Sequence, residues 1–221
     1  RFLDFCEERL WQPIDLDKAA QEKFNEAVHH FYFTKTNERI EAFYEDANVE
    51  DRAETINGEK VPTLKALLDR IDWKSLCSGK PVLFHGDLQP ENILVQAKGF
   101  TLLDWRQDFG GLIEYGDIYY DFAKLYHAMI ISNEVIRKNE YRIVQGEDGV
   151  HLDYLIKSNL WAFKEAFETF LEEKGYDLQK VKILTALVFL NIAPLSHYPY
   201  NVFVYYLGKS MLKKALHPRK K

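Results

Sequence analysis

Residues 82–95 read VLFHGDLQPENILV and residues 100–105 read FTLLDW, and these two stretches decide the fold. The first brings an acid at Asp87 and an amide five positions later at Asn92, and the second closes on another acid at Asp104. A Lys-Gly pair separates their apolar runs, which predicts a β-hairpin. Because the strands of a hairpin lie side by side, Asn92 and Asp104 are predicted to lie near one another.

These polar residues suit the transfer of a phosphoryl group to a hydroxyl. One carboxylate orients the acceptor hydroxyl and takes its proton, while an amide oxygen and a second carboxylate hold Mg²⁺ against the phosphates of ATP. Positioning and charge neutralisation supply most of the rate. As an alternative, Asp87 and Asn92 could serve only to satisfy turn and loop backbone, which is a common role of both residue types.

The order HGDLQPEN at 85–92, followed by DW at 104–105, resembles the aminoglycoside phosphotransferase and choline kinase family, whose signature is HGDxxxxN with an acid on the next strand. Protein kinases carry the related motifs HRDLxxxN and DFG. The resemblance implies a kinase-like fold in which Asp87 is the catalytic base. It also implies that Asn92 and Asp104 bind magnesium and that the cofactors are Mg²⁺ and ATP.

Supporting residues surround this set. The run GDIYYDFA at 116–123 is similar to the GDxxYDLA segment of the family, and by that resemblance Asp121 would brace the catalytic loop from the start of a helix. Asp117 is predicted to cap the same helix. His85 is interpreted as a structural residue that packs beside the loop, and Trp105 as a residue that packs under the metal loop.

Departures from the protein-kinase pattern favour a small-molecule acceptor. Gly86 replaces the Arg of HRD, and an Arg–phosphate pair of the kind that orders kinase activation loops is impossible for Gly. No APE follows Asp104. The triplet DFG at 108–110 lies four residues beyond Asp104, and the spacing from Asn92 favours Asp104 as the metal ligand, with Asp108 as a fallback.

The region before Asp87 lacks the sequence motifs that bind ATP in kinases. It shows neither a glycine-rich phosphate loop nor a strand lysine with a partnering glutamate, and its only glycines before Gly86 are Gly58 and Gly79. Kinase catalysis needs the lysine–glutamate pair as well as the metal site. We therefore expect this chain, which starts at Arg1, to be a carboxy-terminal lobe whose amino-terminal lobe or upstream domain is a missing partner. Alone, it is expected to be inactive.

Composition excludes several other partners. A net charge of −5 and a pI near 5.8 give no general attraction to nucleic acid or to an anionic membrane. No uninterrupted apolar run reaches the length of a membrane span. Cys6 and Cys77 are far apart and without metal-ligand spacing, which predicts reduced thiols and a cytoplasmic location. The basic residues at 213–214 and 218–221 are interpreted as a solvated tail.

The chain is predicted to form one α+β domain over residues 1–221, mainly α, equivalent to a protein-kinase-like carboxy-terminal lobe with a small β-hairpin at the catalytic loop. Its parts are a helical segment at 1–78, a catalytic and metal-binding core at 79–125 and a helical acceptor-side segment at 126–221. The polar residues 46–61 predict a loop. Helical periodicity is strongest in three later stretches, Tyr154–Lys174, Leu178–Ala193 and Val202–Leu216.

The resemblance implies that the acceptor is a hydroxyl of a sugar, an aminoglycoside or an amino alcohol, among which the sequence does not choose. Four side chains are candidates for contacting it, with solvated loops and core packing as the alternative roles: Asp108, Glu114, Trp161 and Tyr198. Two other classes stay open. The chain could be a non-catalytic pseudokinase or binding module, or a hydrolase whose metal site includes His85, which would need further ligands at coherent spacing.

Overall fold

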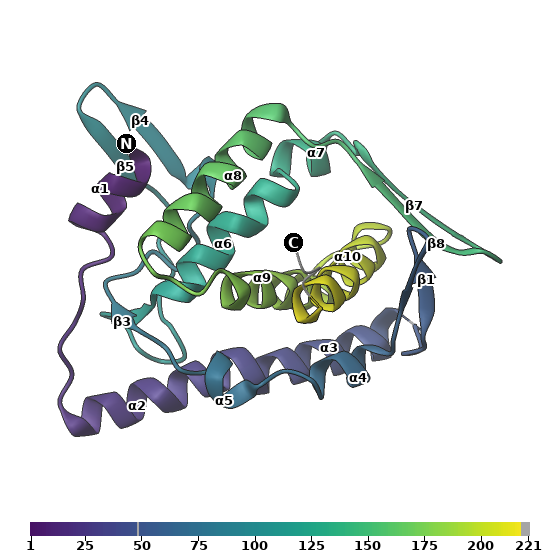
Figure 1. The fold of residues 1–221 in the computed structure, drawn as a ribbon, viewed down its shortest axis with the longest axis horizontal. Helices are drawn as coiled ribbons and strands as arrows, with labels where there is room; N and C mark the ends of the chain where they lie inside the picture. Colours follow the sequence, from purple (N-terminus) through teal and green to yellow (C-terminus); the bar gives the residue numbers. More distant parts are fainter. Residues whose placement is uncertain (48, 218–221) are drawn as a thin grey trace.

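The computed structural model describes residues 1–47 and 49–217, most of which are helical (Figure 1). The α-helices are α1 (Phe2–Arg9), α2 (Lys18–His29), α3 (Lys35–Ala47), α4 (Leu64–Leu68), α5 (Trp73–Leu76), α6 (Ile118–Ile130), α7 (Asn133–Arg137), α8 (Ser158–Glu173), α9 (Leu178–Ile192) and α10 (Tyr200–Leu216). The strands are β1 (Glu54–Ile56), β2 (Glu59–Val61), β3 (Pro81–Val82), β4 (Ile93–Gln96), β5 (Gly99–Leu102), β6 (Gly116–Asp117), β7 (Tyr141–Gly146) and β8 (Gly149–Tyr154). The prediction of an α+β chain that is mainly α is confirmed.

Helix α9 forms the centre of the molecule, where it packs against α6 and α10 (Figure 1). The stretch Leu178–Leu195 has the length and the mean hydropathy, 1.4, of a membrane span, although Lys180 and Lys182 interrupt its apolar residues. Nine residues of α9 are buried against its neighbours. The apolar composition of this stretch therefore matches its position in the protein core.

Helices α2 and α3 form one nearly continuous rod along an edge of the molecule (Figure 1). The Asp17 side chain caps α2 by accepting a hydrogen bond from the Ala20 N–H at 2.8 Å. The apolar positions of α2 recur at spacings of three and four and are buried, as predicted. A π-helical turn, η1 (His30–Thr34), joins the two helices, and it turns Phe31 and Tyr32 toward the interior.

The predicted hairpin is confirmed as β4 paired with β5, with Ile93 opposite Leu102. A 3₁₀ turn, η2 (Pro90–Asn92), leads into it. Helix α1 covers one side, where the ring of Phe2 lies 5.1 Å from that of Phe100. Strand β3 pairs with β6 directly before α6, so the chain segment that enters the hairpin is fixed to the start of that helix.

Two expectations about secondary structure were wrong. Residues 46–61, predicted to be a loop, contain the hairpin β1–β2, whose turn residues Asn57 and Gly58 have φ values of 47° and 77°. These are the left-handed values of a type I′ turn, for which Asn-Gly is the typical sequence. The segment 126–221 is not purely helical, because it includes the hairpin β7–β8. The four strands form one sheet in the order β2-β1-β8-β7.

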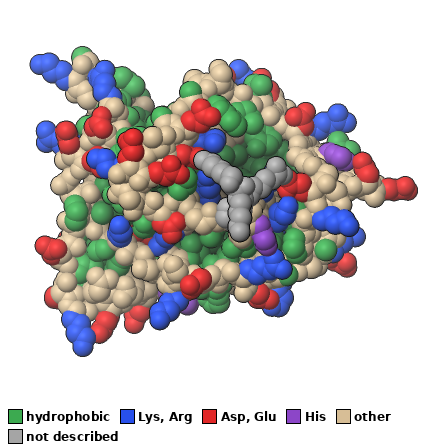
Figure 2. All heavy atoms as spheres, viewed as in Figure 1, with side chains coloured by type: hydrophobic (Ala, Val, Ile, Leu, Met, Phe, Trp, Pro, Cys, Tyr) green, Lys and Arg blue, Asp and Glu red, His purple; other side chains and the backbone are tan. Residues whose placement is uncertain are grey.

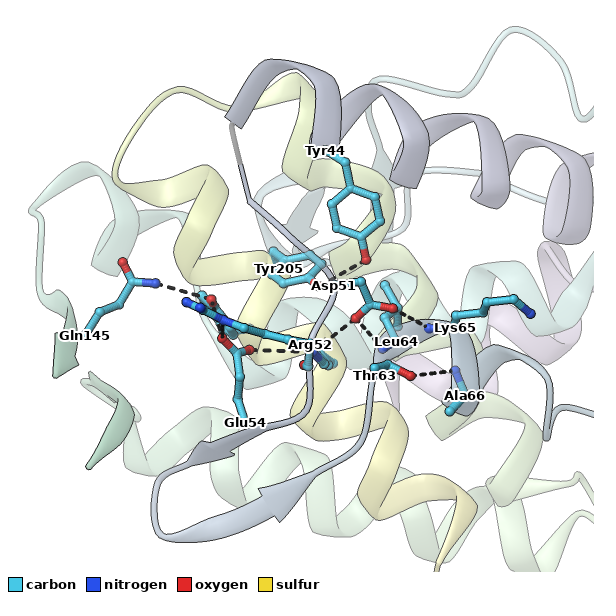
Figure 3. A network of polar contacts seen from close by, with 12 residues as sticks. Tyr44, Asp51, Arg52, Glu54, Thr63, Leu64, Lys65, Ala66, Gln145 and Tyr205 are labelled. Atoms are coloured by element: carbon cyan, nitrogen blue, oxygen red, sulfur yellow. Dashed lines mark hydrogen bonds and ion pairs between the residues drawn. The ribbon is translucent and has the colours of Figure 1, made fainter. Parts of the chain in front are cut away.

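A buried ionic network attaches the β1–β2 hairpin to α10 and α4 (Figure 3). The Asp51 carboxylate accepts hydrogen bonds from the N–H groups of Leu64 and Lys65 at 2.6 and 2.8 Å, at the start of α4. Lys209 of α10 is fully buried, and its Nζ lies 3.3 Å from Asp51 and 3.5 Å from Glu54. The network therefore fixes the connection between the rod of helices and the sheet.

Two of the basic residues predicted to form a solvated tail are helical. Lys213 and Lys214 belong to the last turn of α10, and Lys213 pairs with Glu59 at 2.8 Å. Residues 218–221 lie outside the described residues. Figure 2 shows acidic and basic side chains interspersed over the visible face, as expected for a chain of small net charge.

Candidate functional site

The loop that carries Asp87 is anchored by Asp121, a fully buried residue in the first turn of α6. The Asp121 carboxylate accepts hydrogen bonds from the N–H groups of His85 at 2.8 Å and Gly86 at 2.6 Å. The indole N–H of Trp11 donates a third at 3.1 Å. Burial raises the Asp121 pKa to about 6, and the three donors oppose this increase. Asp121 therefore sits where the resemblance expected a bracing residue.

The shape of this loop requires glycine at position 86. Gly86 has φ of +78°, and a Cβ built there would lie 2.4 Å from the Cβ of Arg106. The Arg106 N–H donates to the His85 carbonyl at 2.9 Å, which brings the segment after Asp104 against the loop. Glycine at this position thus serves close packing, in addition to removing the Arg of the protein-kinase motif.

Asp87 lies beside three polar side chains. Its Oδ1 is 2.7 Å from the Nζ of Lys124 on α6, and both side chains are only partly exposed. The Nδ2 of Asn92 donates to the Asp87 carbonyl at 2.9 Å and approaches Oδ2 at 3.4 Å, while the Gln89 amide reaches Oδ2 at 3.3 Å. The contacts of Oδ2 are thus longer than the contact of Oδ1 with Lys124, and Oδ2 can accept a further hydrogen bond.

Asn92 and Asp104 are brought together by the hairpin. The Leu103 N–H donates to the Asn92 carbonyl at 2.9 Å, which extends the β4–β5 ladder to the residue before Asp104. The Asn92 amide nitrogen is engaged by Asp87, so its oxygen faces away from that residue. Asp104 is exposed with φ of +53°, and in the described part of the chain no hydrogen bond or ion pair engages its carboxylate.

These two oxygen donors fit a hard divalent cation such as Mg²⁺. Among the residues that the structure describes, no three His, Cys, Asp or Glu side chains form a metal-binding group. Mg²⁺ usually takes only one or two carboxylates and completes its octahedron with phosphate oxygens and water. The pair Asn92 and Asp104 is therefore adequate if a phosphate ligand is present.

His85 packs between the loop and the hairpin. Its ring is fully buried and lies 4.8 Å from that of Trp105. The ring Nδ1 accepts a hydrogen bond from the Asp87 N–H at 3.2 Å. Burial lowers the His85 pKa, against the opposing effects of the Leu103 backbone and the carboxylates of Asp87 and Asp104. This environment suits the structural role that the sequence suggested.

A cavity of about 200 Å³ reaches Lys124, the ion-pair partner of Asp87, and sequence reasoning missed its charged lining. Four cationic side chains line it: Lys35, Arg39, Arg106 and Lys124. They come from α3, α6 and the segment after Asp104, while α9 closes the opposite side. One signal was present in the sequence, since Lys35 and Arg39 are like charges at the i, i+4 spacing, which is unfavourable on an ordinary helix.

The four candidate acceptor residues occupy different places. Asp108 is near the cavity, because its charge acts on Lys35, and its carboxylate accepts from the Gly111 N–H at 2.9 Å. Glu114 lies on an exposed loop and does not line the cavity. Trp161 is exposed on α8, where its indole donates to Glu165. Tyr198 lies in a separate depression with Arg52, so neither aromatic residue is brought to Asp87.

Comparison with known proteins gives one match. The sequence model of the phosphotransferase enzyme family matches residues 15–148, which is more than half of the chain. The matched region includes α2, α3, the catalytic loop, the β4–β5 hairpin and α6. No curated protein and no solved structure matches the chain.

Proposed function

Since the chain belongs to the phosphotransferase enzyme family, we propose that it supplies the catalytic and magnesium-binding part of a kinase that phosphorylates a hydroxyl of a small molecule with ATP. The observation that carries this proposal is the surroundings of Asp87, whose carboxylate lies beside the Asn92 amide and 2.7 Å from the Lys124 ammonium. A partly exposed carboxylate held in this way can orient a hydroxyl and take its proton.

Each polar residue then has a definite role. Asp87 accepts the hydroxyl proton through Oδ2 while the hydroxyl oxygen bonds to the transferred phosphorus and the bond from phosphorus to the nucleoside diphosphate breaks. Lys124 holds Oδ1. The Asn92 amide oxygen and the Asp104 carboxylate hold Mg²⁺, which neutralises phosphate charge when it is bound. Asp121 and His85 fix the loop that positions Asp87.

A small acceptor is supported by the segment between Asp104 and α6. Phe109 in this segment is fully buried, with its ring 4.5 Å from that of Phe31 on the helical rod. The segment therefore folds back onto the domain and offers no extended platform for a protein substrate. The cavity of about 200 Å³ that Lys124 lines is smaller than the usual ligand pocket of about 300–1,000 Å³, so only a small molecule would fit it.

ATP binding by residues outside this chain is part of the proposal. Four large apolar side chains are exposed around the β4–β5 hairpin and the residues that follow it: Leu94, Val95, Leu103 and Trp105. Exposed apolar groups that cluster in this way are typical of surfaces that another body covers. We assign that role to the nucleotide and to an amino-terminal lobe, which would also supply the glycine-rich loop and lysine that the sequence lacks.

The test is ADP release by the full-length gene product with Mg-ATP, screened over sugars, aminoglycosides and amino alcohols. We expect acceptor-dependent turnover, and we expect Asp87→Asn to lower kcat by about 10²–10⁴, the usual contribution of a general base. Asp153→Asn makes the same change at an exposed position of β8 and should retain full turnover. Circular dichroism of both variants checks that they fold.

Other outcomes would favour the rival functions. A product that binds Mg-ATP and metabolites but turns over none of them would be a pseudokinase or binding module. Activity that requires a transition metal and does not respond to Mg²⁺ would point to a hydrolase site. If Asp87→Asn is as active as Asp153→Asn, the assignment of Asp87 as the base is wrong.

A further inference from the structure

The cavity beside Asp87 is strongly positive, although the whole chain carries a net charge of −5. Lys35, Arg39, Arg106 and Lys124 line it, and no Asp or Glu does so in the described part of the chain. Only Lys124 has a carboxylate partner within ion-pair distance, namely Asp87. The Arg106 side chain donates to a backbone carbonyl, that of Asp108, at 3.0 Å. Three of the four cations are therefore without an anionic partner among the described residues.

The four cations that line the cavity repel one another. Burial lowers the Lys35 pKa to about 8 together with the smaller effects of the charges of Arg106, Arg39 and Lys124, and only Asp108 opposes this decrease. A bound anion would relieve this repulsion and would gain charge-assisted hydrogen bonds from lysine and guanidinium donors. Two aromatic rings orient Arg106, whose guanidinium carbon lies 4.9 Å from the centre of Phe31 and 5.8 Å from that of Tyr120.

The polar groups of α9 at the cavity wall are held by the protein itself. Asn191 of α9 donates through Nδ2 to the Thr36 hydroxyl at 3.1 Å, and both residues line the cavity. The Asn191 Oδ1 has no accessible surface, so it does not open into the cavity. The polar lining that a ligand can reach is therefore supplied mainly by the cationic side chains.

The cavity is connected to the catalytic carboxylate through Lys124. This residue lines the cavity and contacts Asp87 Oδ1 at 2.7 Å. A molecule in the cavity that reaches Lys124 is therefore separated from the Asp87 carboxylate by this one side chain. Lys35 and Arg106 act from the other walls, which come from α3 and the segment after Asp104.

We propose that the acceptor is a small hydroxylated anion, a sugar or polyol that carries a carboxylate or a phosphate. Its anionic group binds Lys35, Arg39 and Arg106, and one hydroxyl is presented to Asp87. This proposal rests on the proposed kinase function and narrows its substrate class. It disfavours cationic acceptors such as aminoglycosides and amino alcohols, because these would meet three cations without anionic partners.

Binding without nucleotide tests the proposal directly. Isothermal titration calorimetry on the 221-residue chain would compare glucose 6-phosphate and gluconate with two matched probes, neutral glucose and cationic glucosamine. We expect glucose 6-phosphate or gluconate to bind at least about tenfold more tightly than glucose and glucosamine do. Hydrogen bonds to charged groups commonly contribute that much. Equal or tighter binding of glucose or glucosamine would overturn the proposal.

Two paired variants locate the site. Lys35→Gln with Arg39→Gln should weaken binding of the anion about tenfold or more, whereas Lys60→Gln with Arg137→Gln, at exposed positions, should leave it unchanged. If inorganic phosphate binds as tightly as the hydroxylated anion to the unmodified chain, or if ATP displaces the anion competitively, the site does not belong to the acceptor.

Turnover by the full-length product separates this proposal from the proposed function. Phosphorylation of an anionic acceptor supports both. Anion binding to the chain without turnover of any acceptor contradicts the kinase function and leaves the anion site standing. If only neutral or cationic acceptors are phosphorylated and no anion binds, the proposed kinase function is supported and the proposal of an anionic acceptor is wrong.

Discussion

At the scale of single residues, the position of Asp87 depends on Asp121, because the loop before Asp87 donates two N–H groups to that carboxylate. Asparagine at position 121 would offer one oxygen in place of two, so at least one donor would lose its partner. A hydrogen bond to a charged group is worth about 1.5–3 kcal/mol. We expect Asp121→Asn to lower kcat of the full-length product by about ten- to a hundredfold.

The pH dependence of the free energy of unfolding distinguishes Asp121 from an asparagine at the same position, which does not titrate. Its pKa is raised from 3.8 to about 6 in the folded chain, so the folded state binds the proton more tightly than the unfolded state does. The resulting stability is present below about pH 4 and is lost as the pH rises through about 6. Urea denaturation from about pH 4 to 7 should show wild type losing free energy of unfolding relative to Asp121→Asn. If the free energies of unfolding of wild type and Asp121→Asn change in parallel with pH, the raised pKa of Asp121 is contradicted.

Gly86 supports a second prediction, with a matched control in the same region. Alanine at 86 must adopt φ of +78° and place its Cβ 2.4 Å from Arg106. Gly111 has φ of +89°, but a Cβ added there would meet nothing within 4 Å, so Gly111→Ala introduces backbone strain alone, about 1–2 kcal/mol. We expect Gly86→Ala to lose more stability than Gly111→Ala and to abolish turnover.

Thermal unfolding and ADP release would measure the two effects. Since both variants carry a similar backbone penalty, the difference between them isolates the contacts with Arg106 and Phe84. Equal melting temperatures for Gly86→Ala and Gly111→Ala would show that the loop can move away from Arg106, and the close-packing argument for Gly86 would fail.

At the scale of elements, local patterns predicted the structure wherever local interactions decide it. The β4–β5 hairpin and the three helices α8, α9 and α10 follow from turn residues and periodicity. The β1–β2 hairpin was missed although Asn57-Gly58 is a typical type I′ turn, because polar residues dominate the segment around it. Its strands are stabilised from a distance, by β8 and by Lys209 of α10, and no local pattern reports these contacts.

The buried ion pairs of Lys209 support a prediction at this scale. Lys209 is fully buried, and its Nζ also donates to the Arg52 carbonyl at 2.6 Å. Lys209→Met would leave Asp51 without its cation and Glu54 with only the exposed Arg52, and breaking a buried pair commonly costs about 3–5 kcal/mol. Lys213→Met makes the same change one turn later on α10, at a partly exposed pair with Glu59, and should cost about 1 kcal/mol or less.

Urea denaturation of both variants measures these costs. We expect the midpoint to fall much further for Lys209→Met than for Lys213→Met. Hydrogen exchange of the β1–β2 amides should accelerate more in the former, since Lys209 attaches this hairpin to α10 through buried ion pairs and Lys213 through a partly exposed one. If the two variants unfold at the same urea concentration, the network does not stabilise the connection.

At the scale of the whole molecule, the proximity of Asn92 and Asp104 could be predicted from the sequence but the cavity could not. Asp87, Asn92 and Asp104 lie within one short stretch, and a local hairpin joins its two ends. The cations of the cavity come from three separate segments, which contain Lys35, Arg106 and Lys124 and which only the tertiary fold brings together. The charge of the cavity is therefore a property of the assembled chain, and the net charge of −5 gives no indication of it.

This separation of parts leads to a prediction about the molecule as a whole. The proposed acceptor cavity, Asp87 and the two oxygens proposed to bind Mg²⁺ are all within these 221 residues, whereas the sequence offers no glycine-rich loop and no strand lysine for the phosphates. Kinase catalysis needs both sets. We expect the 221-residue chain to bind the anionic acceptor while showing no ATP-dependent turnover, and the full-length product to do both.

Calorimetry and ADP release on the two proteins measure this difference. The acceptor affinity should agree between them, because the cavity is formed by α3, α6, α9 and the segment after Asp104. Affinity for Mg-ATP should be much higher in the full-length product, since the exposed side chains about Leu94 and Trp105 would then be covered by the nucleotide and the lobe that binds it. Turnover by the 221-residue chain would show that Asp87, Asn92 and Asp104 hold the nucleotide without a second lobe.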